Sequence, residues 1–144
     1  MPKDVIIQHF KPSYARADRN IAVLVVSDIP FPDGFTPGPA PHLIQIGPNG
    51  WGGNHRHRRQ ELYVGFGKSL VFIWKDDAGV RHEVPMSAKE GELVAVFVPS
   101  MVPHLVENRS TGIAVMYELL DVDDGEAEPL TGADSLRRPK AQLV

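Results

Sequence analysis

The chain has 144 residues, of which 42% are hydrophobic, and this is the size and composition of one globular domain with one core. Its formal net charge is −3 and its pI is near 6.0, so it lacks the basic surface that nucleic-acid binding usually selects. Cysteine is absent, which excludes disulfides, a thiolate nucleophile and cysteine-bound zinc. No apolar run approaches the ~20 residues that span a bilayer, and MPKDVIIQHF lacks the apolar segment of a secretory signal, so we expect a cytoplasmic protein with no membrane partner.

The first forty residues predict strands followed by a proline-rich loop. Val5–Phe10 is a short apolar segment that we interpret as an edge strand, and Tyr14–Asn20 is polar. Ile21–Val26 (IAVLVV) is a continuous β-branched run, which is typical of a strand. Proline lacks the N–H that a sheet ladder needs, so the proline-rich segment Pro30–Pro41 is predicted to be a loop. This loop either covers the mouth of a cavity or only connects strands.

Residues 41–121 carry the remaining strand signals, which are short apolar runs separated by turn residues. The predicted strands are His42–Ile46, Leu62–Phe66, Ser69–Lys75, Val80–Val84, Leu93–Val98, Leu105–Glu107 and Ile113–Leu120. Short strands without a helical period predict an antiparallel sandwich or barrel, so we expect an all-β single domain.

The chain changes character beyond Asp121. An acidic run is followed by a basic one; the residues are Asp123, Asp124, Glu126, Glu128, Arg137, Arg138 and Lys140. We interpret residues 122–144 as a C-terminal tail that is either disordered or wrapped around a partner subunit.

The segment Gly52–Gly67 (GGNHRHRRQELYVGFG) concentrates groups that bind metals. His55 and His57 are two residues apart, so in a strand both point to the same face. Glu61 can join them along the strand or across a tight turn, and His104 lies in another apolar run. Three imidazoles and one carboxylate are a ligand set for one divalent ion of zinc, iron, nickel or manganese.

The spacing of these residues resembles the first motif of the cupin superfamily. That motif has a glycine, His-x-His, three or four residues, glutamate and a later glycine. In this chain His55 and His57 are followed after three residues by Glu61, and then by Gly65 and Gly67.

The second cupin motif, Pro-x-Gly-x-x-His-x-x-x-Asn, is also matched in part. Pro99, His104 and Asn108 stand at its positions, whereas Met101 replaces the glycine. The resemblance covers residues 41–121 and implies a double-stranded β-helix, the cupin jelly-roll barrel of RmlC-like proteins. Residues 1–40 are then N-terminal strands and a loop that pack on this barrel. The resemblance implies that the metal ligands are His55, His57, Glu61 and His104.

A second resemblance concerns the N-terminal part of the chain. Asp18-Arg19-Asn20, an apolar strand and Asp28-Ile29-Pro30-Phe31 are similar to the opening of the nucleotide-sugar 3,4-ketoisomerases. In those cupins the histidines of a Gly-x-His-x-His stretch, matched here by Gly53–His57, transfer protons. Glu61 departs from that pattern, because it completes a metal shell that those enzymes lack. The two resemblances therefore give the same histidines different roles.

Further residues are candidates for the site. Tyr63 lies two residues past Glu61, and we interpret it as a catalytic acid, a substrate contact or a packing residue. Arg59 is either a solvated charge or a clamp for a phosphate or carboxylate. Trp51, Phe97 and Tyr117 are candidate substrate contacts at the barrel mouth, with the core as their alternative place. We interpret His9, His42 and His82 as structural or exposed, and Asn108 as a residue that fixes the turn after His104.

Together these features predict a metal-binding cupin enzyme that acts on a small polar molecule. The expected reaction is isomerisation or epimerisation of a sugar or related hydroxy-ketone, with Tyr63 or His57 carrying the proton. Two alternatives remain, a non-haem iron dioxygenase and a non-catalytic ligand-binding barrel. We also expect a homodimer, because jelly-roll edges need cover, which the segments before Ile21 and after Asp121 are placed to supply.

Overall fold

The computed structural model describes residues 3–66, 69–86, 91–121 and 126–140. Gly67 of the first motif and Asp123 and Asp124 of the acidic run lie outside these residues. The regular elements of the described residues are strands and three short 3-10 turns, η1 (Ala17–Arg19), η2 (Val26–Asp28) and η3 (Gly132–Asp134). The prediction of an all-β single domain is confirmed.

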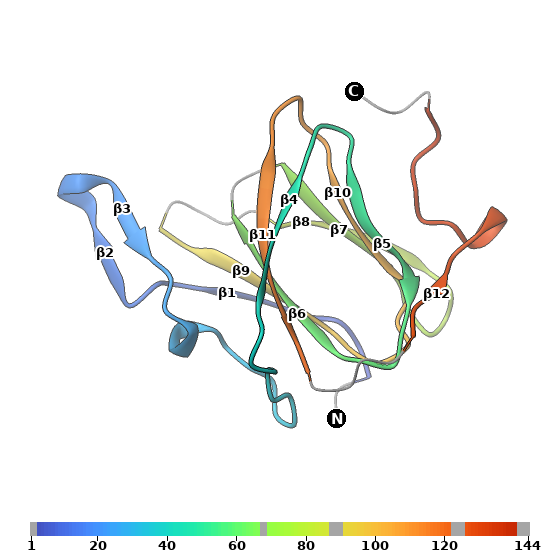
Figure 1. Cartoon of the computed structure of the whole chain (residues 1–144), viewed down its shortest axis with the longest axis horizontal. Helices are drawn as coiled ribbons and strands as arrows, with labels where there is room; N and C mark the ends of the chain where they lie inside the picture. Colours follow the sequence, from blue (N-terminus) through green and yellow to red (C-terminus); the bar gives the residue numbers. More distant parts are fainter. Residues whose placement is uncertain (1–2, 67–68, 87–90, 122–125, 141–144) are drawn as a thin grey trace.

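Ten of the strands form two five-stranded antiparallel sheets (Figure 1). The first sheet has the order β1 (Ile6–Phe10), β9 (Leu93–Val98), β6 (Glu61–Phe66), β11 (Ala114–Leu120), β4 (His42–Ile46). The second has the order β12 (Glu128–Pro129), β5 (Trp51–Arg56), β10 (His104–Asn108), β7 (Leu70–Lys75), β8 (Arg81–Pro85). A separate hairpin pairs β2 (Tyr14–Arg16) with β3 (Ile21–Val23).

The two large sheets pack face to face as a jelly-roll barrel, and the alternation of side chains along each strand decides which residues fill it. The core between the sheets is apolar and includes Phe72, Val96, Val106 and Met116, all at most 2% exposed. At 25 cal/mol per Å² of buried apolar surface, burial of such side chains contributes about 1.5–3 kcal/mol each. The same inner faces carry the polar residues described in the next section.

The proline-rich loop covers the outer face of the first sheet. Phe35 of this loop and Ile29 just before it are buried against Leu62 and Phe97. The Phe35 ring meets the Phe97 ring edge-on, with 5.7 Å between ring centroids. This part of the loop therefore packs on the barrel wall and connects strands.

The strand predicted for Ile21–Val26 is only half as long as expected. Its first three residues form β3, and Val26 begins the turn η2, where Asp28 accepts hydrogen bonds from the backbone and hydroxyl of Ser13 (2.9 and 3.0 Å). Tyr14–Arg16, within the segment described above only as polar, forms the partner strand β2. The continuous β-branched run predicted a strand, and the three residues that form it are all exposed.

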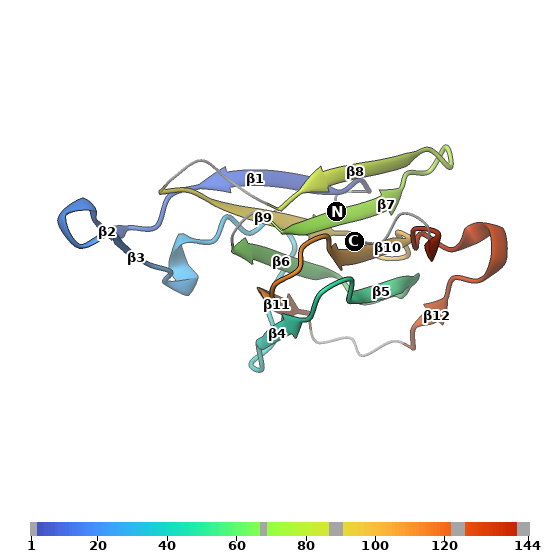
Figure 2. The same cartoon turned by 90° about the horizontal axis from the view of Figure 1, so that it is seen from above.

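The segment 126–140 packs on its own barrel, so its interpretation as disordered or wrapped around a partner is wrong. Its strand β12 pairs with β5, and Leu136 is fully buried against Ile73 and Leu105 on the outer face of the second sheet. The Asn54 side chain accepts a hydrogen bond from the Leu136 backbone N–H at 2.8 Å. Residues 126–140 of the tail are therefore part of the fold (Figure 2).

Truncation of Leu136 tests this tail. Leu136→Ala removes a fully buried side chain and should lower the free energy of unfolding by about 2–5 kcal/mol in urea titrations. Ile113→Ala is the control, because Ile113 is 64% exposed and its truncation should change little. Equal, small effects of both substitutions would show that the tail does not pack on the barrel in solution.

Candidate metal centre

Four predicted ligands lie together at one end of the barrel. His55 is on β5, His57 follows that strand, Glu61 begins β6 and His104 begins β10. One nitrogen of each ring and one oxygen of Glu61 all lie within 4.8 Å of one another. The imidazole centroids form a triangle with sides of 4.7, 5.0 and 5.0 Å.

A bulge in β5 positions His55. His55 lies opposite His104 in the ladder, whereas Leu105 lies opposite Gly53, so Asn54 is an extra residue in β5. Without it, Asn54 would stand opposite His104. The bulge needs a left-handed backbone at Gly53 and Asn54, with φ of +89° and +58°. A Cβ atom on Gly53 would lie 3.0 Å from the His104 carbonyl oxygen, so the position requires glycine.

The loop before His104 keeps the left-handed backbone that a glycine would give, although Met101 stands at the glycine position of the second motif. Met101, which replaces the motif glycine, has a left-handed φ of +64°. Its backbone N–H donates to the carbonyl oxygen of His57 at 2.7 Å, and this bond ties the two histidine segments together. As predicted, Asn108 fixes the turns nearby, because its amide donates to the carbonyls of Ile46 and Gly112 at 3.0 and 2.7 Å.

Backbone carbonyls set the orientation of two of the rings. The Nδ1 atoms of His57 and His104 lie 2.9 Å from the Arg59 carbonyl oxygen and 2.8 Å from the Val102 carbonyl oxygen. A carbonyl only accepts, so Nδ1 carries the hydrogen and Nε2 is left to face the cluster. His57 Nε2 is buried, lies 3.0 Å from Glu61 Oε1 and makes no aligned hydrogen bond with the described residues. This buried lone pair beside a carboxylate is the arrangement that a cation would satisfy.

Burial and proximity set the charges of the cluster. Burial raises the pKa of Glu61, but the His104 and His57 rings beside the carboxylate outweigh it and hold that pKa well below its usual range. Burial, together with the neighbouring His104 and His57, lowers the pKa of His55 to about 4. At neutral pH the site therefore presents an ionised carboxylate and a neutral His55, the forms that bind a metal.

Tyr63 and Arg59 both contact Glu61; Tyr63 shares its face of β6, and Arg59 lies in the loop before that strand. The Tyr63 hydroxyl donates to Glu61 Oε2 and lies 3.4 Å from His104 Nε2. Arg59 Nε donates to Glu61 Oε1 at 3.0 Å. Burial raises the pKa of Tyr63 well above 10 and the Glu61 charge adds to this, so Tyr63 keeps its proton at neutral pH.

Glu118 shares the inner face with Tyr63 and was not singled out in the sequence, whereas His42, expected to be structural or exposed, is exposed and pairs with Glu118. Glu118 on β11 lies opposite Tyr63 in one ladder and opposite His42 in the other, so all three share the inner face. His42 Nδ1 lies 2.9 Å from Glu118 Oε1, and the His42 side chain is 52% exposed. Burial raises the pKa of Glu118, with a further contribution from Glu61. The sequence signal that could have identified Glu118 is a glutamate within an otherwise apolar strand.

The structure does not bring the three predicted aromatic contacts to this cluster. Phe97 and Tyr117 belong to the outer-face core beneath the proline-rich loop. Trp51 is 42% exposed and the Arg137 guanidinium lies over its ring, 4.5 Å from the centroid. Because inward and outward side chains alternate along each strand, the expectation that these residues line the site is corrected.

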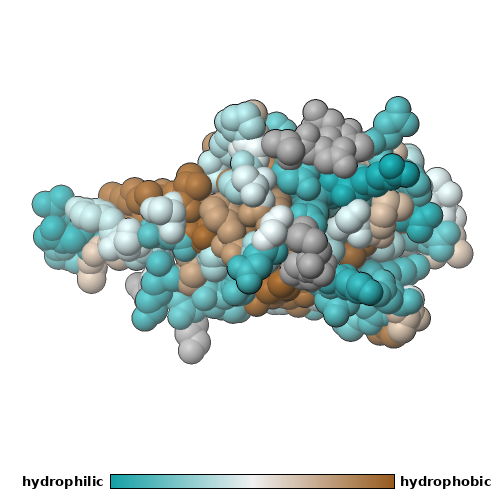
Figure 3. All heavy atoms as spheres, turned by 90° about the horizontal axis from the view of Figure 1, so that it is seen from below, coloured by the Kyte–Doolittle hydropathy of each residue, from teal (hydrophilic) through white to brown (hydrophobic). Residues whose placement is uncertain are grey.

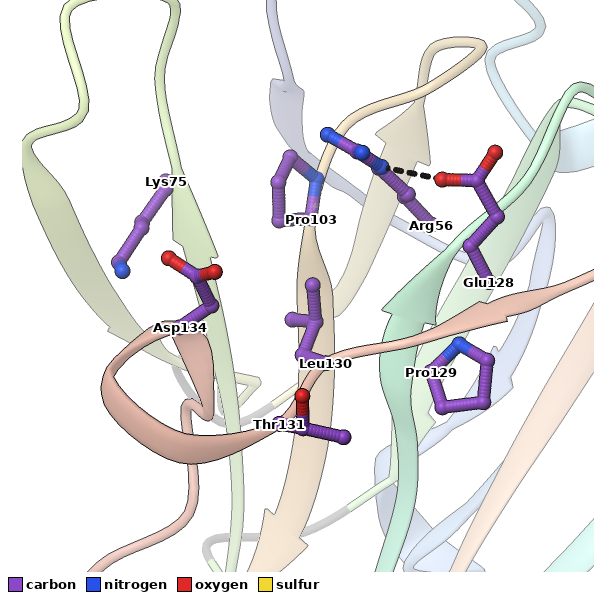
Figure 4. Close-up of a pocket in the computed structure, with 8 residues that line it drawn as sticks. All are labelled: Arg56, Lys75, Pro103, Glu128, Pro129, Leu130, Thr131 and Asp134. Carbon is purple, nitrogen blue, oxygen red and sulfur yellow. Dashed lines mark hydrogen bonds and ion pairs between the residues drawn. The ribbon is translucent and has the colours of Figure 1, made fainter.

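A separate pocket of about 170 Å³ lies where the tail crosses the outer side of β5 (Figure 4). Arg56 in its wall forms an ion pair with Glu128, with 2.7 Å between Nε and Oε2. Lys75 and Asp134 stand at its other side, so its charges are balanced. None of the four clustered ligands lines it.

No model of a protein family matches this sequence, and no curated protein matches it. The chain is similar in structure to a dTDP sugar isomerase from Desulfovibrio desulfuricans G20, with 13% identity, a TM-score of 0.61 and coverage of 95% of this chain and 87% of that one. It is similar to QdtA, a sugar 3,4-ketoisomerase from Thermoanaerobacterium thermosaccharolyticum in complex with TDP, with 15% identity, a TM-score of 0.54 and coverage of 94% and 90%.

A cupin 2 domain-containing protein from Halorhodospira halophila has 13% identity, a TM-score of 0.54 and coverage of 89% and 84%. The capsular polysaccharide assembling protein CapF from Staphylococcus aureus has 17% identity and a TM-score of 0.53 over 64% of this chain, which spans only 27% of CapF. At these identities the likenesses show a shared fold.

A glycine pair tests how the bulge holds the site. Gly53→Ala places a Cβ in a left-handed conformation and against the His104 carbonyl, and should cost roughly 1–2 kcal/mol or more of unfolding free energy. Gly52→Ala is the matched control, because nothing lies within 4 Å of its added Cβ. Urea unfolding of metal-free protein measures both. Equal stability of the two variants would contradict the bulge geometry.

Proposed function

Since the chain has the cupin fold, we propose that it is a metal-dependent enzyme that moves a proton beside the carbonyl of a small polar molecule, such as a sugar or related hydroxy-ketone. The observation that carries this proposal is the proton-bearing hydroxyl of Tyr63 within the cluster of three imidazoles and the Glu61 carboxylate. That arrangement joins a cation-binding donor set to a group that can donate a proton.

The residues present fit a divalent metal. The donors are a nitrogen of His55, Nε2 of His57 and His104, and a carboxylate oxygen of Glu61. The buried His57 Nε2, which lacks an aligned hydrogen bond, supports a cation at this point. Nitrogen and carboxylate donors suit zinc, iron, nickel or manganese. A bound ion supplies Lewis-acid chemistry, which polarises a carbonyl oxygen and stabilises negative charge on it.

The surrounding side chains supply binding and proton transfer. Tyr63 Oη holds a proton on the inner face, and Glu118, which is paired with His42, is the second proton carrier on that face. Arg59, which is partly exposed, presents its guanidinium to an anionic group of the substrate. His57 is fixed through Nδ1, so we assign it a ligand role and give proton transfer to Tyr63 and Glu118.

The structural neighbours favour isomerisation over oxygen chemistry. A dTDP sugar isomerase and a sugar 3,4-ketoisomerase align with 95% and 94% of this chain. The same four donors also suit a non-haem iron dioxygenase, which needs a redox-active ion and open coordination positions. An isomerase needs only a Lewis acid and a proton carrier.

Elemental analysis tests the metal centre. Purified protein should carry close to one divalent ion per chain. His57→Ala and His104→Ala should each lose most of it, because each removes a ligand and leaves the set incomplete. His82→Ala is the control, since His82 pairs with Asp76, stacks on Trp74 and is not one of the four clustered donors. Full occupancy in both ligand variants would remove the basis of the proposal.

The reaction type is tested with keto sugars, free and nucleotide-linked, incubated in heavy water. The product should gain deuterium at the carbon beside the carbonyl, and zinc-loaded enzyme should be active. Tyr63→Phe should slow turnover by about 10²–10⁴-fold while the metal content stays unchanged, because it removes one proton and no ligand. Stoichiometric oxygen uptake that is lost on exchange of iron for zinc would assign the protein to the dioxygenases instead.

A further inference from the structure

Residues 128–136 of the tail, which we call the strap, cross the outer side of β5 beside the candidate ligand His55 (Figure 4). In the ladder of β12 with β5, Pro129 stands opposite His55. Further along the strap, Leu136 is buried against Leu105 of β10. Seen from below, the end of the molecule that carries the strap is mainly hydrophilic, whereas hydrophobic residues gather near the β2–β3 hairpin (Figure 3). The apolar side chains of the strap are thus used against its own barrel.

The Asn54 side chain is the polar anchor of the strap. Its Oδ1 accepts from the backbone N–H of Leu136 at 2.8 Å, and its Nδ2 donates to the Ser135 hydroxyl and the Leu130 carbonyl at 3.1 and 3.4 Å. The Asn54 carbonyl also accepts from the Leu130 N–H at 2.8 Å. An amide accepts on one side and donates on the other, which a carboxylate or an apolar side chain cannot do. Since Asn54 is only 9% exposed, loss of its side chain leaves these strap groups without their partners.

Asn54 is also the residue that determines where His55 lies. As the extra residue of the bulge, Asn54 lets His55 stand opposite His104. The bulge holds Asn54 in a left-handed conformation with φ of +58°. This conformation is unfavourable for residues that carry a Cβ, although asparagine tolerates it better than most. The side-chain bonds to the strap offset this cost, so a docked strap favours the bulged form of β5.

We propose that Asn54 is a positioning residue for the metal centre, and that docking of the strap and binding of the cation stabilise each other. This inference rests on the proposed metal centre and adds a second element that controls it. The strap and His55 act on the same bulge, so each favours the form of β5 that the other needs. Thermodynamic linkage then requires that the two effects are equal in free energy.

Zinc affinity, measured by competition with a chelating dye, tests this coupling. Asn54→Gly keeps the left-handed backbone and removes the side-chain bonds to the strap. It should weaken zinc binding about tenfold, the lower end of the loss on removing groups that orient metal ligands. Asn20→Gly is the matched control, because Asn20 is exposed and left-handed (φ +51°) in the turn between β2 and β3. Equal zinc affinity of the two variants would overturn the coupling.

A double substitution tests whether Asn54 acts through His55. When His55 is already replaced by alanine, the position of residue 55 no longer matters to the metal. Asn54→Gly should then cause little further loss of zinc affinity, so the two losses are not additive. A residue that only supports the fold would weaken binding by the same factor in both backgrounds, and that result would overturn the positioning role.

Hydrogen exchange of the wild type measures the same coupling from the strap and needs no variant. The Leu136 N–H, which is bound to Asn54, should become about tenfold more protected when zinc binds, because linkage makes the factors equal. The Phe35 N–H is the control, since it donates to the Pro32 carbonyl at 3.1 Å in the loop on the other sheet.

Two results of the exchange experiment would overturn the coupling, namely unchanged protection of Leu136 or an equal rise at Leu136 and Phe35. The zinc titration separates this failure from failure of the metal centre. A wild type that binds no zinc would overturn the metal centre and the coupling with it. Tight zinc binding that does not respond to the strap would overturn the coupling alone.

Discussion

A carboxylate buried in the barrel has to be compensated, and the surroundings of Glu61 follow from that requirement. Glu61 is 1% exposed, and taking an ionised carboxylate out of water costs several kcal/mol. The Tyr63 hydroxyl and Arg59 contact its two oxygens, and the rings of His57 and His104 lie beside them. His55 is neutral at neutral pH, because burial lowers its pKa to about 4, so it brings a lone pair but no positive charge. A divalent cation at the centre of the three rings is the group that would complete the compensation.

The rest of the architecture holds this cluster in place. The bulge at Asn54 brings His55 opposite His104, and the same Asn54 side chain accepts from Leu136 and so links the bulge to the tail. The left-handed Met101 ties the loop before His104 to His57. The apolar core between the sheets packs beside these ligands, and Phe72 of this core stacks on the His104 ring. Residues 126–140 and the proline-rich loop pack on the outer faces of the two sheets. This packing therefore helps to hold a site that lies on the inner faces.

The spacing of residues along the sequence predicts the candidate ligands, but it does not predict which residues the neighbouring strands bring beside them. The two-residue spacing of His55 and His57 and the motif around His104 were sufficient to predict that the candidate donors lie together. Glu118 lies beside Tyr63 only through pairing of β11 with β6, which lie far apart in sequence. Phe97 and Tyr117 lie on the outer face, because the position of a residue in the alternation along a strand, and not its type, determines which face it occupies. Five of the six residues of the IAVLVV run are exposed, so a continuous apolar run predicts a strand without showing what that strand packs against.

X-ray absorption of the metal-loaded protein tests the central claim most directly. The account predicts a first shell of nitrogen and oxygen only, with metal–nitrogen distances of about 2.0–2.1 Å for zinc, and the outer-shell scattering of three imidazoles. His55→Ala should reduce this signal to two imidazoles, since His55 is one of the three clustered rings. A bound ion whose spectrum shows no imidazole scattering, or one unchanged by this substitution, would contradict a centre built on His55, His57, Glu61 and His104.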